Sequence, residues 1–174
     1  REIYYTRRET GGGAVQDAAT HSFDLIQYLA GRFDSVFCDY GHQALEGVEV
    51  EDTVHLTARA ADNRVMVSLA LNQFMAPNES MLQFNGDRGS VRLQLHEHRW
   101  GLFNHGVEAW QWSEPLVNER DDLFRRQAET LVDAANGKPA FRCSLEDARH
   151  TLCINLAALE SAGEKVVPVD GFGG

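Results

Sequence analysis

A run of three glycines, Gly11 to Gly13, stands directly before a segment with the apolar periodicity of a helix. The predicted helix extends from about Ala14 to Ala30, and Gly31 supplies its stop. At about 100° per residue the apolar side chains share one broad arc, made up of Val15, Ala18, Ala19, Phe23, Leu25, Ile26, Leu29 and Ala30. The small residues predict that the start of this helix closely approaches a neighbouring surface or ligand, with free N–H groups pointing outward.

The other side of this helix carries an acid and an imidazole. Asp17, His21, Asp24 and Tyr28 fall within roughly 60° of one another. An Asp and a His at positions i and i+4 share a face and can hold a proton donor or acceptor near neutral pH. The residues alone leave two interpretations open, a solvated face with a weak surface pair worth under about 1 kcal/mol, or a catalytic pair.

Strands are predicted at residues 1–5, 35–40, 54–60, 65–71, 80–84, 90–95, 99–103, 107–112 and 166–169. The first two flank the glycine-led helix as one βαβ-like unit, and the third and fourth form a long antiparallel hairpin. Two more helices are expected, one over about 123–135 and one that Ser144 opens with a capping box. The chain therefore predicts an α+β fold, a single domain over 1–174 with a mostly antiparallel open β-sheet and helices packed on one face.

Composition excludes several classes of partner and site. The 174 residues carry 26 acidic and 16 basic side chains, for a net charge of -10, so we expect no nucleic acid and no anionic membrane surface as partner. No apolar run approaches the roughly 20 residues of a membrane span. Three cysteines without zinc spacing favour a reducing, cytoplasmic setting. His96 and His98 lack a third ligand nearby, so no metal site is expected.

The predicted strands hold more large apolar side chains than one helix-covered face can absorb. They are Met66, Phe74, Met81, Phe84, Trp100, Phe103, Trp110 and Trp112. Exposed apolar patches of several hundred Å² usually mark association, so we expect a homodimer or homotetramer formed through the open sheet face. The alternative is that the tryptophans lie in the core or on loops.

The glycine run does not match a dinucleotide fingerprint. A G-x-G-x-x-G count that starts at Gly11 reaches Gln16 where the third glycine should stand. Only one βαβ-like unit precedes the antiparallel hairpins, whereas a dinucleotide fold repeats that unit. Arg7 and Arg8 could contact a phosphate or carboxylate substrate, or form salt bridges with acids of the chain itself.

Taken in order, the motifs of the chain resemble the C-terminal domain of the glucose-fructose oxidoreductase, inositol dehydrogenase and rhizopine-catabolism (Gfo/Idh/MocA) family. They are Gly11-Gly12-Gly13-x-x-x-Asp17-x-x-x-His21-x-x-Asp24-Leu25, Val48-Glu49-Val50-Glu51-Asp52-Thr53, Gly86-Asp87-Arg88-Gly89-Ser90-Val91, Phe124-x-x-Gln127, Ala134 to Pro139, Ser144 to Ala148, and Ala157-x-x-x-Ser161. The similarity extends over nearly the whole chain.

The resemblance implies the substrate domain of an NAD(P)-dependent dehydrogenase or reductase that acts on sugars, cyclitols or similar polyols. NAD or NADP would be bound mainly by an N-terminal Rossmann domain that this chain lacks, with Gly12 and Gly13 as the predicted cofactor contacts here. Asp17 and His21 would bind substrate hydroxyls and assist proton transfer. Thr20, where the family often has a glycine or another small residue, would add a hydroxyl near the cleft.

Two other functions stay open. The same fold could serve as a non-catalytic sugar-sensing or scaffold module. A free-standing small-molecule binding domain without a cofactor partner is the third possibility. A glycine fingerprint in upstream sequence would favour the enzyme over both.

Overall fold

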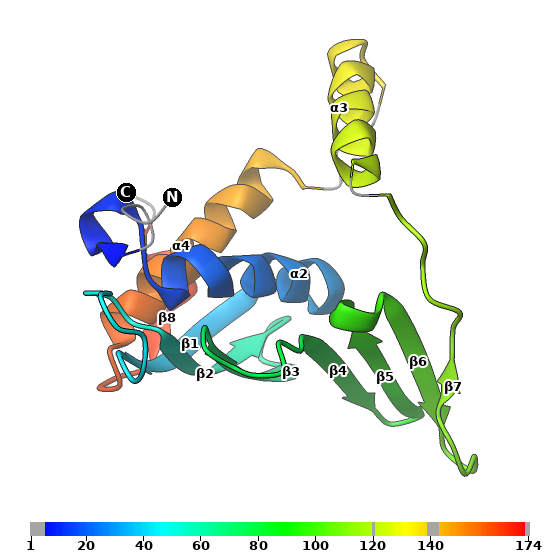
Figure 1. Ribbon diagram of the computed structural model, residues 1–174, viewed down its shortest axis with the longest axis horizontal. Coiled ribbons are helices and arrows are strands. Elements are labelled where there is room, and N and C mark those ends of the chain that lie inside the picture. The colour runs from blue at the N-terminus through cyan, green and yellow to red at the C-terminus, as the bar shows by residue number, and fades with distance from the viewer. Residues whose placement is uncertain (1–5, 120, 139–142, 173–174) are drawn as a thin grey trace. The chain divides into compact units, whose positions relative to one another are not determined.

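The computed structural model describes residues 6–119, 121–138 and 143–172 (Figure 1). They form two compact units, one with the described residues of 1–74 and 142–174, the other with those of 75–141. The α+β prediction is confirmed, with the strands divided between two antiparallel four-stranded sheets. The expected strand at 1–5 lies outside the described residues. That a single domain spans 1–174 stays a prediction.

The first unit contains a sheet with the strand order β3-β2-β1-β8. Its strands are β1 (Phe33–Gly41), β2 (Thr53–Ala60), β3 (Val65–Asn72) and β8 (Val167–Pro168). Its helices are the π-helix η2 (Ala14–Ala19), α2 (Thr20–Ala30), α4 (Leu145–Ser161) and two short 3-10 turns, η1 (Arg8–Thr10) and η4 (Val169–Phe172). The hairpin expected over 54–60 and 65–71 is present as β2 and β3 in uninterrupted register.

Helices α2 and α4 lie side by side over one face of this sheet (Figure 1). The core lies between them and the strands, where alternate residues of β1 and β2 are buried, among them Val36, Cys38, Leu56 and Ala58. The ring of Phe23 from α2 meets that of Phe33 edge-on at 6.2 Å. The other face bears the intervening, mostly polar residues Ser35, Asp39, His55, Thr57 and Arg59.

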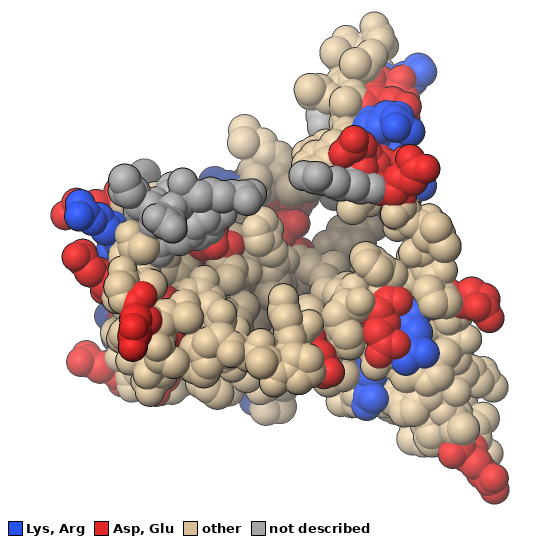
Figure 2. Space-filling model, in the orientation of Figure 1, with Lys and Arg blue, Asp and Glu red and all other residues tan. Residues whose placement is uncertain are grey.

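The second unit contains a meander with the strand order β4-β5-β6-β7. Its elements are β4 (Met81–Gly86), β5 (Gly89–Gln94), the 3-10 turn η3 (Leu95–Glu97), β6 (Arg99–Asn104), β7 (Gln111–Trp112) and α3 (Asp122–Ala135). Of the strand expected over 107–112, only the last two residues form a strand, β7, because the chain turns before it, where the Val107 N–H bonds the Asn104 carbonyl. None of the α3 residues is buried. Basic and acidic side chains lie together along α3 (Figure 2).

Candidate functional site

The predicted helix over 14–30 begins as a π-helix and continues as α2. A stripe of Val15, Ala19, Phe23 and Ile26 is buried, so Asp17, half-buried, and His21, exposed, lie on the outer side. Within the described part of the chain, neither the Asp17 carboxylate nor the His21 imidazole has a hydrogen bond or an ion pair. Both groups are therefore available to a ligand, and π-turns inside helices occur often at functional sites.

The π-helical winding of η2 changes which side chains of α2 are buried, compared with the prediction from an α-helical period. Leu29, assigned to the apolar arc, is 45% exposed, whereas Gln27 is buried. The Gln27 side-chain amide donates to the Asp147 carbonyl of α4 at 3.2 Å, so a polar residue takes the place expected for a leucine. An α-helical period over the whole segment places Leu29, and not Gln27, on the buried side, so the sequence pattern does not predict this contact.

The start of η2 is capped by a carboxylate of the chain itself. The Ala14 N–H bonds the Glu51 carbonyl at 2.8 Å, and the Val15 N–H bonds Glu51 Oε1 at 3.2 Å. Gly13 has a φ of +113°, and a Cβ there would overlap the Glu51 carboxylate. The expectation that these N–H groups point outward is therefore wrong for Ala14 and Val15. The neighbouring surface that the glycines admit is Glu51.

Glu51 also binds Arg8, which agrees with the interpretation that this arginine forms a salt bridge within the chain. Arg8 Nη2 lies 3.2 Å from Glu51 Oε2, and only 2% of the Glu51 side chain is exposed. The same guanidinium lies 5.7 Å from the centre of the Tyr40 ring. Arg8 thus closes the capped end of the helix. Glu51 and Asp52 form an acidic pair just before the alternating strand β2, and nothing in that local pattern indicates that Glu51 contacts the first helix.

Asp52, the next residue, organises the loop before β2. Its carboxylate is fully buried and accepts hydrogen bonds from the N–H groups of Gln43, Ala44 and Leu45 at 2.8–2.9 Å and from the Thr53 hydroxyl at 2.9 Å. Burial alone would raise the pKa of this carboxyl, but the donated hydrogen bonds hold it well below its ordinary value. Asp52 is a structural anion, and sequence reasoning missed it.

Thr20 points to α4 and not into open solvent. Asn155 Nδ2 donates to Thr20 Oγ1 at 2.9 Å, and only 5% of Asn155 is exposed. One turn further along α2, Asp24 Oδ1 accepts a hydrogen bond from the Thr151 hydroxyl at 3.3 Å. These contacts join α2 to α4 immediately beside His21. The predicted role of Thr20 in binding substrate stays a prediction.

His150 of α4 is buried at the other end of the helix pair. The Phe33 N–H donates to its Nε2 at 3.1 Å, and Arg32 Nη2 lies 3.0 Å from its Nδ1. Burial, followed by the charge of Arg32, lowers the pKa of the imidazole. His150 is therefore a neutral group that fixes the start of β1.

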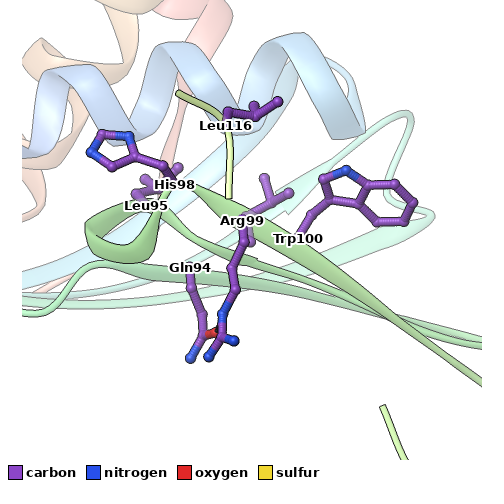
Figure 3. A pocket seen from close by; sticks show the side chains of 7 residues that line it. Gln94, Leu95, His98, Arg99, Trp100 and Leu116 are labelled. Atoms are coloured by element: carbon purple, nitrogen blue, oxygen red, sulfur yellow. Dashed lines mark hydrogen bonds between the residues drawn. The ribbon is translucent and has the colours of Figure 1, made fainter. Parts of the chain in front are cut away.

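The second unit offers a separate, small pocket of about 170 Å³ beside η3. Its lining residues are Leu93, Gln94, Leu95, His98, Arg99, Trp100 and Leu116. Leu95, His98, Trp100 and Leu116 surround the space, whereas the heads of Gln94 and Arg99 point away from it and meet at 2.8 Å (Figure 3). The pocket is mainly apolar and presents one imidazole, so its residues favour contact with an apolar group over acid–base chemistry.

The described residues contain neither a metal-binding group of side chains nor a helix that could span a membrane. Within 6–119, 121–138 and 143–172, no three His, Cys, Asp or Glu side chains are grouped to hold a metal ion. In the same ranges no helix combines the length and apolarity needed to cross a bilayer.

Comparison with known proteins shows which family this chain is similar to. The sequence profile of the GFO/IDH/MocA C-terminal domain matches residues 1–92. The uncharacterized oxidoreductase sll0816 of Synechocystis sp. is 25% identical over 120 residues, which make up 60% of this chain and 32% of that protein.

Solved structures share the fold. A putative oxidoreductase from Thermotoga maritima superposes with a TM-score of 0.78 at 24% identity, covering 97% of this chain and 50% of its own. Levoglucosan dehydrogenase, in complex with NADH and levoglucosan, superposes with a TM-score of 0.83 at 20% identity, covering 96% and 53%. The chain thus spans about half the length of these structures and about a third of the curated relative.

Proposed function

Because the chain belongs to the GFO/IDH/MocA C-terminal domain family, whose members are NAD(P)-dependent oxidoreductases, we propose that it is a substrate-binding and oligomerisation domain of such an enzyme, acting on a sugar, a cyclitol or a related polyol. The observation that carries the proposal is the outer face of the first helix, where Asp17 and His21 stand without partners among the described residues. The complex of levoglucosan dehydrogenase with NADH and levoglucosan supports this substrate class.

Asp17 and His21 have different roles in this proposal. Asp17 accepts hydrogen bonds from substrate hydroxyls and orients the carbinol. His21 takes the hydroxyl proton as the carbinol is oxidised, a general-base role that typically contributes about 10²- to 10⁴-fold. NAD or NADP, when bound, accepts the hydride.

The cofactor fits only partly against the residues of this domain. The Glu51 carboxylate already accepts the hydrogen bond of the Val15 N–H, and its charge would repel a phosphate group. The diphosphate of a dinucleotide therefore has no anion site at the start of η2. Contact of Gly12 and Gly13 with the cofactor stays a prediction. We therefore assign most of the NAD(P) contacts to polypeptide outside this chain.

Association of copies is the second part of the proposal. Large apolar side chains remain exposed on both units, namely Met66 (75%), Phe74 (42%), Met81 (57%) and Trp100 (44%). We propose a homodimer or homotetramer formed through the open sheet face. Analytical ultracentrifugation of Met66→Lys should show dissociation, and Asp87→Lys, an exposed turn residue, should not.

We also propose a reducing, cytoplasmic setting. Cys38, Cys143 and Cys153 are all free. Burial, with a smaller contribution from Asp39, raises the pKa of the Cys38 thiol to about 12, so this thiol stays protonated and unreactive inside the core.

The site is tested by two variants and a matched control. In calorimetry of this chain against a panel of sugars and cyclitols, Asp17→Asn and His21→Ala should each weaken the binding that the unaltered chain shows. In an enzyme that joins this domain to a dinucleotide-binding half, His21→Ala should lower NAD(P)-dependent turnover at least tenfold. His55→Ala, on the exposed face of β2, should change neither quantity.

Two other outcomes of these experiments would favour a different function or contradict the site. Binding that depends on His21 without turnover in the joined enzyme would favour the non-catalytic sensing module. Binding and turnover that survive both substitutions would contradict the assignment of the site.

A further inference from the structure

Helices α2 and α4 meet along a row of polar contacts that begins next to His21. The pairs are Thr20 with Asn155, Asp24 with Thr151, and Gln27 with the Asp147 carbonyl. Along α2 these residues follow one another at helical spacing, and along α4 their partners run in the opposite order. The row therefore sets how far α2 is turned about its own axis.

Asn155 is the most buried polar residue in this row. Its Nδ2 donates to Thr20 Oγ1 and to the Thr151 carbonyl, both at 2.9 Å. Its Oδ1 is buried without a hydrogen-bond partner among the described residues. A buried acceptor that lacks a donor costs stability, and an apolar side chain of similar size would avoid that cost. Stability alone therefore does not account for an amide at this position.

The residue that Asn155 holds stands at a sensitive point of the helix. η2 ends at Ala19, α2 begins at Thr20, and His21 follows directly. A π-turn adds a residue to the turn, so loss of the π-turn would rotate every later side chain by about 100° around the axis. Holding Thr20 thus fixes the direction in which the His21 imidazole leaves the helix.

We propose that Asn155 is a positioning residue for His21. Its amide clamps the Thr20 hydroxyl against α4 at the junction of η2 and α2, and thereby keeps the imidazole on the side that Asp17 also occupies. The use of that position in polyol oxidation rests on the proposed function, whereas the clamp itself does not.

The test compares stability with the environment of one imidazole. Asn155→Leu removes both donated bonds and the unpartnered carbonyl, so its urea midpoint should equal or exceed that of the unaltered chain. The carbon-bound ring protons of His21, identified in NMR spectra by their loss in His21→Ala, should nevertheless shift. The affinity for a polyol that binds the unaltered chain should fall at least threefold. Leu152→Ala, on an exposed part of α4, should leave the His21 signals in place.

Thr20→Val breaks the same bond from the other side and covers the case in which Asn155→Leu fails to fold. It should move the His21 signals in the same way, and adding Asn155→Leu to it should have little further effect. Unmoved His21 signals in Thr20→Val would overturn the proposal. If the signals move but polyol affinity is insensitive to His21→Ala, the clamp stands and the proposed function fails.

Discussion

Glu51 Oε1 lies 3.2 Å from the backbone nitrogen of Val15, so the chain supplies its own anion to the start of its first helix. The Glu51 side chain is 2% exposed and also binds Arg8. A carboxylate at this end interacts favourably with the helix dipole and satisfies an N–H that has no partner within the helix.

Glu51→Gln should lower the free energy of unfolding by about 1–3 kcal/mol, because it leaves the Arg8 guanidinium without its carboxylate and weakens the cap. Urea titration at pH 7 measures the change. Glu49→Gln, an exposed acid two residues earlier, should stay within about 0.5 kcal/mol of the unaltered chain. Equal effects of the two substitutions would contradict the cap.

Gly13→Ala should destabilise the chain by more than the strain of a positive φ alone, since the added Cβ would overlap the Glu51 carboxylate. Gly47→Ala is the matched control, with a φ of +75° and no atom within 4 Å of the added carbon. The control should cost about 1–2 kcal/mol, and Gly13→Ala clearly more. Thermal unfolding of both variants gives the comparison, and similar midpoints would show that Glu51 moves aside freely.

Stability should decline as the pH falls from about 7 to 5, because of His150. The folded state lowers the pKa of this imidazole below its ordinary value of 6.5, so the unfolded chain binds more protons in this range. Urea unfolding at several pH values measures the slope. His150→Gln should flatten it, whereas His55→Gln, on an exposed strand position, should not. The same slope in the His150→Gln variant would refute this origin.

Asp52→Asn should cost about 2 kcal/mol or more at pH 7, because an amide nitrogen would face the N–H groups of Ala44 and Leu45. The folded state lowers the pKa of Asp52, so its contribution is present above the unfolded value near 3.8 and is lost as the pH falls below it. The difference between the two proteins should therefore shrink in acid. Asp87→Asn, in an exposed turn, provides the control, and a difference that does not depend on pH would contradict this account.

Local patterns predicted most of the secondary structure. Strands β2 and β3 follow their alternating residues, and Ser144 caps α4 with the expected box, its hydroxyl accepting the Asp147 N–H while Asp147 accepts the Ser144 N–H. These features depend on neighbours in the sequence. The division of the strands into two sheets depends on which strands pair across the segment 73–80, and no periodicity encodes that choice.

The candidate site was predictable in part. Asp17 and His21 lie on the outer side of the helix, as their spacing indicated, although their roles stay predictions. The contacts of Glu51 with Val15 and of Asn155 with Thr20 join residues 36 and 135 positions apart. Such pairs arise only when β2 and α4 pack against the first helix, so periodicity along one segment could not reveal them.

The strands at two outer edges of the sheets are unusually short. β7 and β8 contain two residues each, and Pro168 in β8 has no N–H to donate. An incoming strand would find almost no backbone ladder there, so fibre-like growth from these two sides is blocked by the fold itself. The chain can thus keep sizeable apolar surfaces on its sheets while two of the routes to uncontrolled aggregation stay closed.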